Sequence, residues 1–249
     1  VIIYTGNVTA LREIITTDQA TEIGAAVTYT AAFEALSEND TSLGELLRRL
    51  GSVHIRNSGT IGGNIANGSP IGDSMPPLMA LGAKIVLRHV FGTRTLHLED
   101  YFIAYGKQDR QPGEFIEKIL VPHCAANVQF KTYKISKRFD QDISAVCAGF
   151  ALHFDGGVIT EARLAYGGMA ATPKRLRQAE AVLIGEKWNE TTLKKAITAV
   201  AAEFTPLSDL RASAQYRLRV AQNLLARFYL ETTNTETATQ VYRYAELSS

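Results

Sequence analysis

The sequence predicts an α+β fold, in which a strand-rich region in the second half of the chain is followed by helices. The dipeptide Asp155-Gly156 separates two apolar runs, and Asp-Gly in that position is a strong signal for a β-hairpin. Segment 122–127 marks the change to a hairpin followed by helices, which is typical of α+β proteins. We therefore expect a three-stranded antiparallel sheet with helices, its strands lying at Phe130–Ser136, Ala145–Phe154 and Val158–Tyr166.

Three helices are expected after this sheet. Lys174–Ile184 ends at Gly185, and glycine is common just beyond the end of a helix. Asn189 is a candidate N-cap for a helix over Thr191–Phe204. The last helix, Ala212–Tyr229, is expected to bury a stripe that excludes its arginines and consists of Tyr216, Val220, Leu224 and Phe228. Such a stripe is far more often part of a core than of a cofactor site.

The first 122 residues alternate short strands and helices. Pro76 and Pro77 suit the first turn of a helix, and Leu43–Leu50 has one apolar and one charged face. The other expected elements are a helix at Ala10–Ile15 and strands at Val1–Tyr4, Thr21–Val27, Lys84–Arg88, Thr93–Leu98 and Phe115–Val121. We expect one subdomain over residues 1–122, a second over 123–232, and a polar tail over 233–249.

The composition excludes several classes of protein. Of the 249 residues, 46% are hydrophobic and 20% are charged, and the formal net charge is +1. This balance gives no field that would attract nucleic acid or an acidic membrane, and no apolar run could span a bilayer. The N-terminal residues VIIYTG are not expected to be a signal peptide, and the absence of an initiator methionine suggests a processed chain or a fragment.

Cysteine, histidine and motif usage argues against metal, disulfide or hydrolytic chemistry. Cys124 and Cys147 form no disulfide framework and have no CxxC neighbour, so they hold no iron–sulfur cluster and indicate a reducing cytoplasm. The five histidines show no metal-ligand spacing. There is no GxGxxG after a strand, no Walker loop, no HExxH and no nucleophile elbow, so no catalytic side chain and no metal ligand are expected.

The segment Thr60–Asp73, TIGGNIANGSPIGD, is the part of the sequence most typical of a ligand site. Gly62 and Gly63 allow a close approach of the backbone to a bound group, and successive N–H groups in such a loop can converge on an anion. Side chains that can bond a ribose, a phosphate or a ring edge are added by Asn64, Asn67, Ser69 and Asp73. The alternative is a tight turn between two elements, but the density of small polar residues favours a ligand loop.

Thr60–Asp73 resembles the second flavin-binding loop in the FAD domain of molybdenum hydroxylases, in particular of the small subunit of bacterial xanthine dehydrogenases. Further matches lie at KQDRQPGEF (Lys107–Phe115), SKRFDQDISAVC (Ser136–Cys147), YGGMA (Tyr166–Ala170) and TPLSDLRASAQYR (Thr205–Arg217). The resemblance implies a flavin-binding α/β subdomain of the PCMH type over residues 1–122. The family's first Gly-rich loop, which grips the FAD pyrophosphate, is absent from this sequence, so either a preceding segment or another chain is expected to supply it.

The resemblance also implies a set of FAD-binding residues. Thr60 and Asn64 match positions that reach the diphosphate or ribityl oxygens, and Asp73 matches one that accepts from a ribityl hydroxyl. Lys134 matches a lysine beside the flavin ring, although by itself it would be interpreted as a strand-surface lysine, and Leu50 would fit a core equally well. The complete set is Leu50, Gly51, Thr60, Gly63, Asn64, Ser69, Asp73, Ile116 and Lys134.

An NAD site is implied beside the flavin. Tyr105 and Tyr166 match aromatic positions near the nicotinamide, and Asp140 lies in a charged stretch that faces the docking NAD in the family. Carboxylates beside a flavin tune its potential and discriminate for or against NAD. The alternative is that this stretch is a solvated charged loop. Gly106 stands where many relatives carry arginine, which is a departure from the family pattern.

The function implied by the resemblance is the FAD part of xanthine dehydrogenase. In that role, electrons pass from iron–sulfur clusters through FAD to NAD during the hydroxylation of hypoxanthine or xanthine. The molybdenum cofactor and the two-iron two-sulfur clusters would lie on other segments or chains, namely a molybdenum-bearing large subunit and an iron–sulfur domain of a hetero-oligomer. The alternatives are a flavoprotein subunit of a carbon monoxide or aromatic-acid hydroxylase, and a non-catalytic assembly subunit.

Thr205–Arg217 has two interpretations. Arg211 and Arg217 offer forked donors that could contact a partner chain, so this segment is a candidate docking surface. The alternative is that both arginines are intrachain struts between the last two helices.

Overall fold

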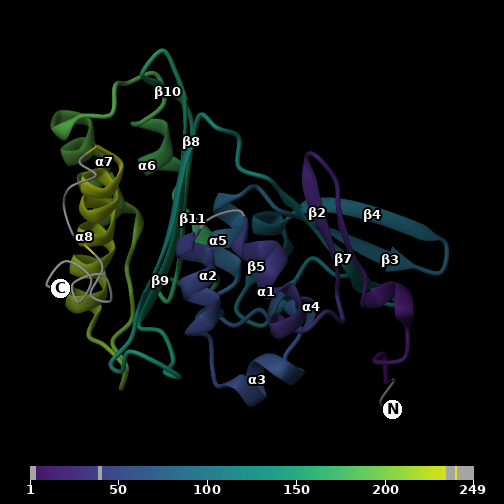
Figure 1. Ribbon diagram of the computed structural model, residues 1–249. Coiled ribbons are helices and arrows are strands. Elements are labelled where there is room, and N and C mark those ends of the chain that lie inside the picture. The colour runs from purple at the N-terminus through teal and green to yellow at the C-terminus, as the bar shows by residue number, and fades with distance from the viewer. Residues whose placement is uncertain (1–3, 39–40, 234–238, 240–249) are drawn as a thin grey trace, which may run out of the picture.

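The computed structural model describes residues 4–38, 41–233 and 239, and its main feature is two antiparallel sheets separated by a layer of helices (Figure 1). Helices α7 and α8 cover one face of a four-stranded sheet. Helix α5 packs on the opposite face of that sheet, and the five-stranded sheet lies beyond the helical layer (Figure 1). The helical layer is therefore where the first and second halves of the chain meet.

The five-stranded sheet is built from the first half of the chain in the order β1-β2-β7-β3-β4. Every pairing within it is antiparallel. Its strands are β1 (Ile14–Thr16), β2 (Ala20–Gly24), β3 (Lys84–His89), β4 (Gly92–His97) and β7 (Phe115–Pro122), and a separate hairpin is formed by β5 (Phe102–Ala104) and β6 (Lys107–Gln108). Strand β7, from the end of this region, lies at the centre of the sheet.

The helical layer consists of short helices, each of nine residues or fewer. They are α1 (Tyr29–Ser37), α2 (Thr41–Arg48), α3 (Val53–Ser58), α4 (Ile61–Asn67) and α5 (Met75–Ala80), with 3-10 turns at Thr9–Leu11 and Leu98–Tyr101. Helix α5 begins with prolines near its first turn, as the sequence predicts. All its residues are buried because it is enclosed between the two sheets.

The second sheet has four strands where three were expected. Their order is β11-β10-β9-β8, with bounds β8 (Val128–Ile135), β9 (Val146–Asp155), β10 (Val158–Gly167) and β11 (Lys174–Arg175). The three longer strands match the predicted ones, and the turn of the β9–β10 hairpin contains Gly156 with a positive φ of 55°. The extra strand forms where the sequence predicted the start of a helix.

The short strand β11 is held by a buried ion-pair network. Arg175 donates from Nε and Nη2 to the two carboxylate oxygens of Glu180, both at 2.9 Å. Its Nη1 also donates to Oε1 of Glu99 at 2.6 Å, which links the second sheet to the 3-10 turn before β5. Helix α6 is consequently short, Arg177–Ala181, because the two residues before Leu176 pair with β10 instead.

The two long C-terminal helices differ in how well they were predicted. Helix α7 (Glu190–Glu203) begins at the expected N-cap, since Asn189 Oδ1 accepts from the backbone of Thr191 and Thr192. In α8 (Ala214–Thr233) the buried face is shifted from the predicted stripe: Tyr216 is half exposed. The buried residues of α8 are Arg217, Ala221, Leu224, Leu225 and Phe228.

One predicted N-terminal element was wrong. Ala10–Ile15 was expected to be a helix, but a single 3-10 turn ends at Leu11 and β1 starts at Ile14. The β-branched residues Ile14 and Ile15 favour a strand, where their side chains fit a pleated surface. The predicted strand at Val1–Tyr4 lies outside the described residues apart from Tyr4. Of the predicted tail, Thr233 is instead the last residue of α8, and the rest lies outside the described residues apart from Thr239.

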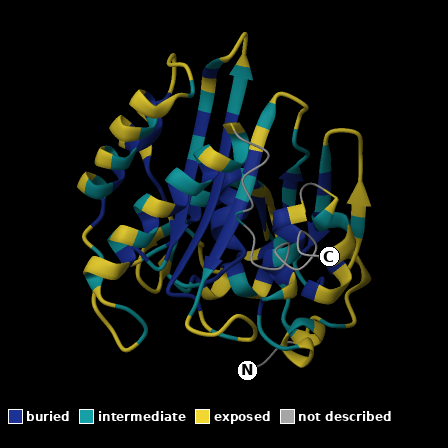
Figure 2. Cartoon of the chain, turned by 60° about the vertical axis from the view of Figure 1, so that its left-hand side comes forward, coloured by how far each residue is buried: buried dark blue, intermediate teal, exposed yellow. Residues whose placement is uncertain are grey.

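Buried side chains form two clusters, one on each side of the four-stranded sheet. The first includes α1, α2, α4, α5 and the five-stranded sheet, and it also takes in Phe130, Ala151 and Ala165 from the other sheet. The second lies between the four-stranded sheet and α6–α8. In Figure 2 the strands of this sheet are dark blue, and the helices outside it carry exposed yellow bands. The two halves of the chain therefore share a core.

Candidate functional site

The segment Thr60–Asp73 is partly helical, although the sequence predicted a loop. Thr60 Oγ1 caps α4 by accepting from the backbone N–H of Gly63 at 3.0 Å, and Gly68 ends the helix with a positive φ of 61°. Ile61 and Ile65 are completely buried, one turn apart on the same side of α4. The glycines and asparagines between them are thus carried on a short helix anchored in the core.

The backbone N–H groups at the start of α4 do not converge on an open site. The N–H of Ile61 donates to Val27 O at 3.1 Å, and that of Gly62 donates to Ala25 O at 3.2 Å. The N–H groups of Gly63 and Asn64 bond to the side chain and carbonyl of the N-cap residue. These donors are satisfied within the chain, so contacts from this helix to a ligand must come from side chains.

Positions 62 and 63 are both glycine, but for different structural reasons. A Cβ on Gly62 would lie 2.6 Å from the carbonyl oxygen of Ala25, so this position is required for packing. Gly63 is exposed, and a Cβ there would meet Thr60 Oγ1 at 2.7 Å. A side chain at Gly63 would therefore disturb the cap and cover the open surface at the start of α4.

Asn64 is oriented by a hydrogen-bonded chain of buried groups. The Tyr29 hydroxyl donates to Ser74 Oγ at 3.1 Å, and Ser74 Oγ donates to Asn64 Oδ1 at 2.7 Å. Burial raises the pKa of Tyr29 far above its ordinary value, so its hydroxyl remains a donor. With Oδ1 occupied in this way, the half-buried Asn64 amide presents its NH₂ group as the donor for a ligand.

Asp73 lies at the junction of the two halves of the chain, where it bonds to two residues from the second half. Its Oδ2 accepts from Lys134 Nζ at 2.5 Å, and its Oδ1 accepts from Ser144 Oγ at 2.5 Å. Lys134 Nζ also donates to Ser144 Oγ at 2.7 Å. The alternative interpretation of Lys134 as a surface lysine was wrong, because its side chain is only 1% exposed.

The other four predicted FAD-binding residues differ in how deeply they are buried. Leu50 and Gly51 follow α2, and their carbonyls accept from Arg56 Nη1 at 3.2 and 2.8 Å. Leu50 is buried in the first core cluster and Gly51 has a positive φ of 56°. Ile116 is a buried residue of β7. Ser69, by contrast, lies in the turn after α4 with a half-buried side chain.

The charged loop after β8 is attached to α2 by Arg49. Arg49 donates to the carbonyls of Phe139 and Lys134 at 2.8 and 3.2 Å, and its guanidinium lies 4.5 Å from the Phe139 ring centre. Asp140 is exposed and lies 3.6 Å from Arg48 Nη1. This loop borders a cleft of about 310 Å³ along the edge of β8, between α2 and α8.

Within this loop Asp142 has a structural role. Its carboxylate accepts from the backbone N–H groups of Arg138 and Ile143 at 2.8 and 3.0 Å. These bonds, the one from Arg138 foremost, lower the pKa of Asp142.

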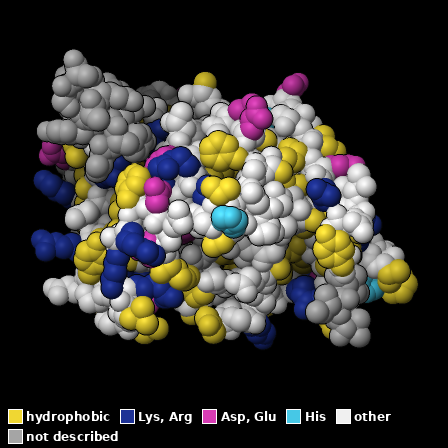
Figure 3. All heavy atoms as spheres, turned by 60° about the horizontal axis from the view of Figure 1, so that its bottom comes forward, with side chains coloured by type: hydrophobic (Ala, Val, Ile, Leu, Met, Phe, Trp, Pro, Cys, Tyr) yellow, Lys and Arg dark blue, Asp and Glu magenta, His cyan; other side chains and the backbone are white. Residues whose placement is uncertain are grey.

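Basic side chains gather on one side of the face at which α3 lies. Figure 3 views the molecule from that end (compare Figure 1).

The structure does not bring together the three residues predicted for NAD. Tyr105 is exposed at the tip of the β5–β6 hairpin, and Asp140 is exposed in the loop after β8. Tyr166 is completely buried in the second core cluster, where its hydroxyl donates to the carbonyl of Ala221 at 3.0 Å. Tyr166 is therefore a core residue that a dinucleotide on the surface does not reach.

The stretch KQDRQPGEF is held by one arginine from β4. Arg94 donates from Nε and Nη2 to the two carboxylate oxygens of Glu114 at 2.7 and 2.8 Å, and from Nη1 to Asp109 at 2.8 Å. The hydrogen bonds from Arg94 are the largest cause that lowers the pKa of Glu114 to about 2. The stretch therefore has a fixed conformation that is set by ion pairs.

The predicted docking role of Arg217 was wrong. Arg217 is 2% exposed, and its Nη1 donates to the carbonyls of Ala145 and, at 2.9 Å, Gly168. Its Nη2 donates to Asp209 at 2.7 Å, and Arg211 also lies 3.3 Å from that carboxylate. Arg217 therefore acts as a strut that holds the loop before α8 against the second sheet, whereas Arg211 contacts Asp209 within that loop.

Sequence reasoning missed Tyr29, Arg49 and Ser144. Ser144 lies inside a stretch that was recognised, whereas Arg49 was assigned to the outer face of a helix and Tyr29 had no local signal. In the part of the chain that the structure describes, no group of three or more His, Cys, Asp or Glu side chains could hold a metal ion. No helix within the same residues is long and apolar enough to cross a membrane.

Two family models match most of the chain. Residues 1–124 match the FAD binding domain in molybdopterin dehydrogenase, and residues 131–232 match the CO dehydrogenase flavoprotein C-terminal domain. The chain therefore belongs to the family of FAD-binding domains of molybdopterin dehydrogenases. The family and the α+β fold predicted from the sequence are both confirmed.

Individual relatives act on different substrates, to judge by their names. The chain is 34% identical to the glyceraldehyde dehydrogenase medium chain of Sulfolobus acidocaldarius, over 74% of this chain and 65% of that protein. It is 33% identical to the xanthine dehydrogenase/oxidase of Gallus gallus, over 75% of this chain and 14% of that protein. The chain thus spans less than two thirds of the length of either relative.

Solved structures give the same assignment of fold. The Cu,Mo-CO dehydrogenase in its cyanide-inactivated form has a chain that matches with a TM-score of 0.79 and 29% identity, covering 88% of this chain and 77% of that chain. The quinoline 2-oxidoreductase of Pseudomonas putida 86 matches with a TM-score of 0.78 and 27% identity, covering 90% of this chain and 79% of that chain.

Proposed function

We propose that this chain is the FAD-carrying part of a xanthine-dehydrogenase-like molybdenum hydroxylase. The observation that carries the proposal is the junction at which Asn64 and Asp73, from the first family-matched region, lie with Lys134 from the second. FAD supplies the electron-transfer chemistry when bound, so the protein has only to bind, orient and tune it. No side chain of this chain is assigned a reacting role.

The residues at the junction suit a ligand with many hydrogen-bonding groups. The Thr60 hydroxyl accepts from Gly63 N–H and keeps its own proton to donate, and the Asn64 NH₂ group is a second donor. The carboxylate of Asp73 has acceptor capacity beyond its two observed bonds. Gly63 allows close approach, and the remaining predicted contacts are Leu50, Gly51, Ser69, Ile116 and Lys134.

In the proposed assembly, electrons reach this FAD from two-iron two-sulfur clusters and leave to NAD. The substrate, hypoxanthine or xanthine, would react at a molybdenum cofactor on a large partner subunit, in a cytoplasmic hetero-oligomer. Tyr105 and Asp140 are the exposed candidates for NAD contact. A core position excludes Tyr166 from this role.

A second candidate is the flavoprotein part of a molybdenum hydroxylase that uses another substrate and another acceptor. It is favoured by the similarity to the glyceraldehyde dehydrogenase medium chain and to the CO dehydrogenase chain. The burial of Tyr166 and the glycine at position 106 also favour it, because each removes a predicted NAD contact.

The test is to purify the chain together with its partner subunits and to record its visible absorbance during anaerobic addition of NADH. The proposal predicts a yellow protein that NADH bleaches, and reduction of NAD when xanthine is supplied. Flavin that is bleached by an aldehyde or another substrate but not by NADH supports the second candidate. A colourless complex that takes up no added FAD would show a non-catalytic assembly subunit.

The affinity of these 249 residues for FAD can be compared with that of the assembled complex. We propose that they bind FAD weakly by themselves and that the complex binds it tightly, because the backbone N–H groups at the start of α4 are already bonded within the chain and do not hold a phosphate. Flavin fluorescence titration compares the two preparations. Equal affinity would show that the residues present here are sufficient.

A further inference from the structure

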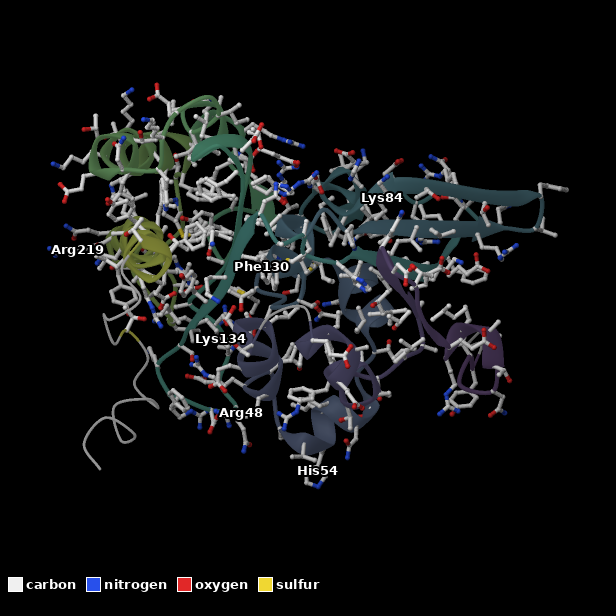
Figure 4. The ribbon with its side chains drawn as sticks, turned by 45° about the horizontal axis from the view of Figure 1, so that its top comes forward. Arg48, His54, Lys84, Phe130, Lys134 and Arg219 are labelled. Atoms are coloured by element: carbon white, nitrogen blue, oxygen red, sulfur yellow. The ribbon has the colours of Figure 1, made fainter. Side chains whose placement is uncertain are left out.

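Ser144 hydrogen-bonds to Asp73 and Lys134, the buried ion pair that joins the two family-matched regions. It lies just before β9, while Lys134 lies on β8 and Asp73 precedes α5 (Figure 4 labels Lys134). The three side chains form a closed ring of hydrogen bonds with lengths of 2.5, 2.5 and 2.7 Å. Ser144 is 1% exposed and is not among the FAD-binding residues that the resemblance implies.

In this ring of hydrogen bonds Ser144 is both a donor and an acceptor. A serine hydroxyl has one proton, and here it points to Asp73, while the oxygen accepts from Lys134. The hydroxyl therefore fixes the carboxylate and the ammonium group at once. A buried charge is tolerated when it is paired and its other hydrogen-bonding groups are satisfied, and Ser144 supplies the second bond of each partner.

The backbone of Asp73 is fixed as well. The Cys147 thiol donates to the Asp73 carbonyl at 3.4 Å, and burial raises the pKa of this thiol well above its ordinary value, so it keeps its proton. The next residue, Ser74, is held by Tyr29. With the main chain anchored on both sides, the side-chain direction of Asp73 depends on Lys134 and Ser144.

We propose that Ser144 is a positioning residue of the cofactor site: from the second family-matched region, it sets the direction and the neutralisation of the Asp73 carboxylate that a bound flavin meets. This proposal rests on the proposed function. Without the hydroxyl, Asp73 loses one donor and Lys134 loses one acceptor. The carboxylate of Asp73 is then less well neutralised, and we expect FAD to bind more weakly. Because the uncompensated negative charge lies close to the bound flavin, reduction of the flavin also becomes less favourable.

The experiment compares Ser144→Ala with Ser144→Thr, which keeps a hydroxyl, in the chain co-assembled with its partners. Ser42→Ala is the matched control, because Ser42 is also buried, but its Oγ accepts from the backbone of Thr132. Ser144→Ala is expected to raise the FAD dissociation constant about 5- to 30-fold, the usual effect of one lost buried hydrogen bond. It should also lower the flavin midpoint potential and change the flavin absorption spectrum.

If Ser144 only stabilised the fold, its substitution would not change the flavin midpoint potential or the flavin absorption spectrum. Ser42→Ala is expected to lower the melting temperature and to leave potential and spectrum unchanged, and Ser144→Thr should restore both toward wild type. Wild-type affinity, potential and spectrum in Ser144→Ala would overturn the positioning role while leaving the proposed function intact. Failure of the wild-type complex to bind FAD would overturn both. If Ser144→Ala does not fold, Ser144→Cys, which replaces the hydroxyl by a somewhat larger thiol that is a weaker donor, decides the question by the same potential measurement.

Discussion

Lys134 Nζ lies 2.5 Å from Asp73 Oδ2, and this buried ion pair joins residues that are 61 positions apart in the sequence. Asp73 belongs to the segment that was identified as the cofactor loop, and Lys134 belongs to the second sheet. The pair therefore links the predicted flavin site to the region of the chain that carries the C-terminal helices.

Removing either partner of this pair should destabilise the folded chain. Lys134→Met or Asp73→Leu leaves an uncompensated buried charge, and we expect a loss of about 3–5 kcal/mol in the free energy of unfolding for each. The double variant should lose less than the sum, as measured by urea denaturation of the FAD-free chain. Lys118→Met, which breaks a half-exposed pair with Glu22, is the control and should cost about 0–1 kcal/mol. Additive losses would contradict the coupling.

Asn64 tests cofactor contact more directly than Asp73, because it is not part of a buried ion pair. Asn64→Leu removes a half-buried amide that has an unused NH₂ group, so we expect FAD affinity to fall by about 1–3 kcal/mol. The control is Asn67→Leu. Asn67 is exposed at the other end of the same helix and is not in the predicted set of FAD-binding residues, so this variant should keep its flavin. Flavin content after dialysis is the measurement. Equal retention in the two variants would remove α4 from the cofactor site.

The role of Arg217 as a strut can be distinguished from a docking role of the segment Thr205–Arg217. Arg217→Ala leaves the carbonyls of Ala145 and Gly168 without their buried donor, so the melting temperature should fall, while the half-buried Arg211→Ala should change it little. Both variants should still co-purify with the partner subunits. Loss of co-purification at an unchanged melting temperature would restore the docking interpretation.

Acid should weaken the ion pairs of the KQDRQPGEF stretch. Hydrogen bonds from Arg94 hold the pKa of Glu114 at about 2, below its ordinary value of 4.5. A lowered carboxylate pKa means that this group stabilises the fold fully above about pH 4.5 and that the contribution is lost as the pH falls toward 2. The stability difference between wild type and Glu114→Gln should shrink across that window in urea titrations. A difference that stays constant with pH would contradict the assignment.

Local signals predicted much of the fold because they act over a few residues. Asn189 capped its helix as expected, and the Asp155-Gly156 turn joined the two strands that were predicted. Helix α4 (Ile61–Asn67) was missed because glycine-rich composition outweighed two helical signals that were present. These signals were a capping threonine and the spacing of Ile61 and Ile65, which place one apolar face on the core.

The connections within the candidate site could not be predicted because they depend on distant parts of the chain. Ser144 meets Asp73 across 71 positions, and Tyr29 meets Ser74 across 45. No periodicity or spacing encodes such a meeting. The buried face of α8 was misjudged for a similar reason, since Arg217 is drawn inward by the carbonyls of a neighbouring loop rather than by hydrophobicity.

The division of the junction between two halves of the chain has a thermodynamic consequence. A ligand that contacts Asp73 while Asp73 is paired with Lys134 binds the closed arrangement of both halves and not either half when unfolded. By mass action such a ligand raises the stability of the whole unit by RT ln(1 + [L]/Kd). Cofactor loading and folding are then linked equilibria, so FAD bound at this junction stabilises both halves of the chain together.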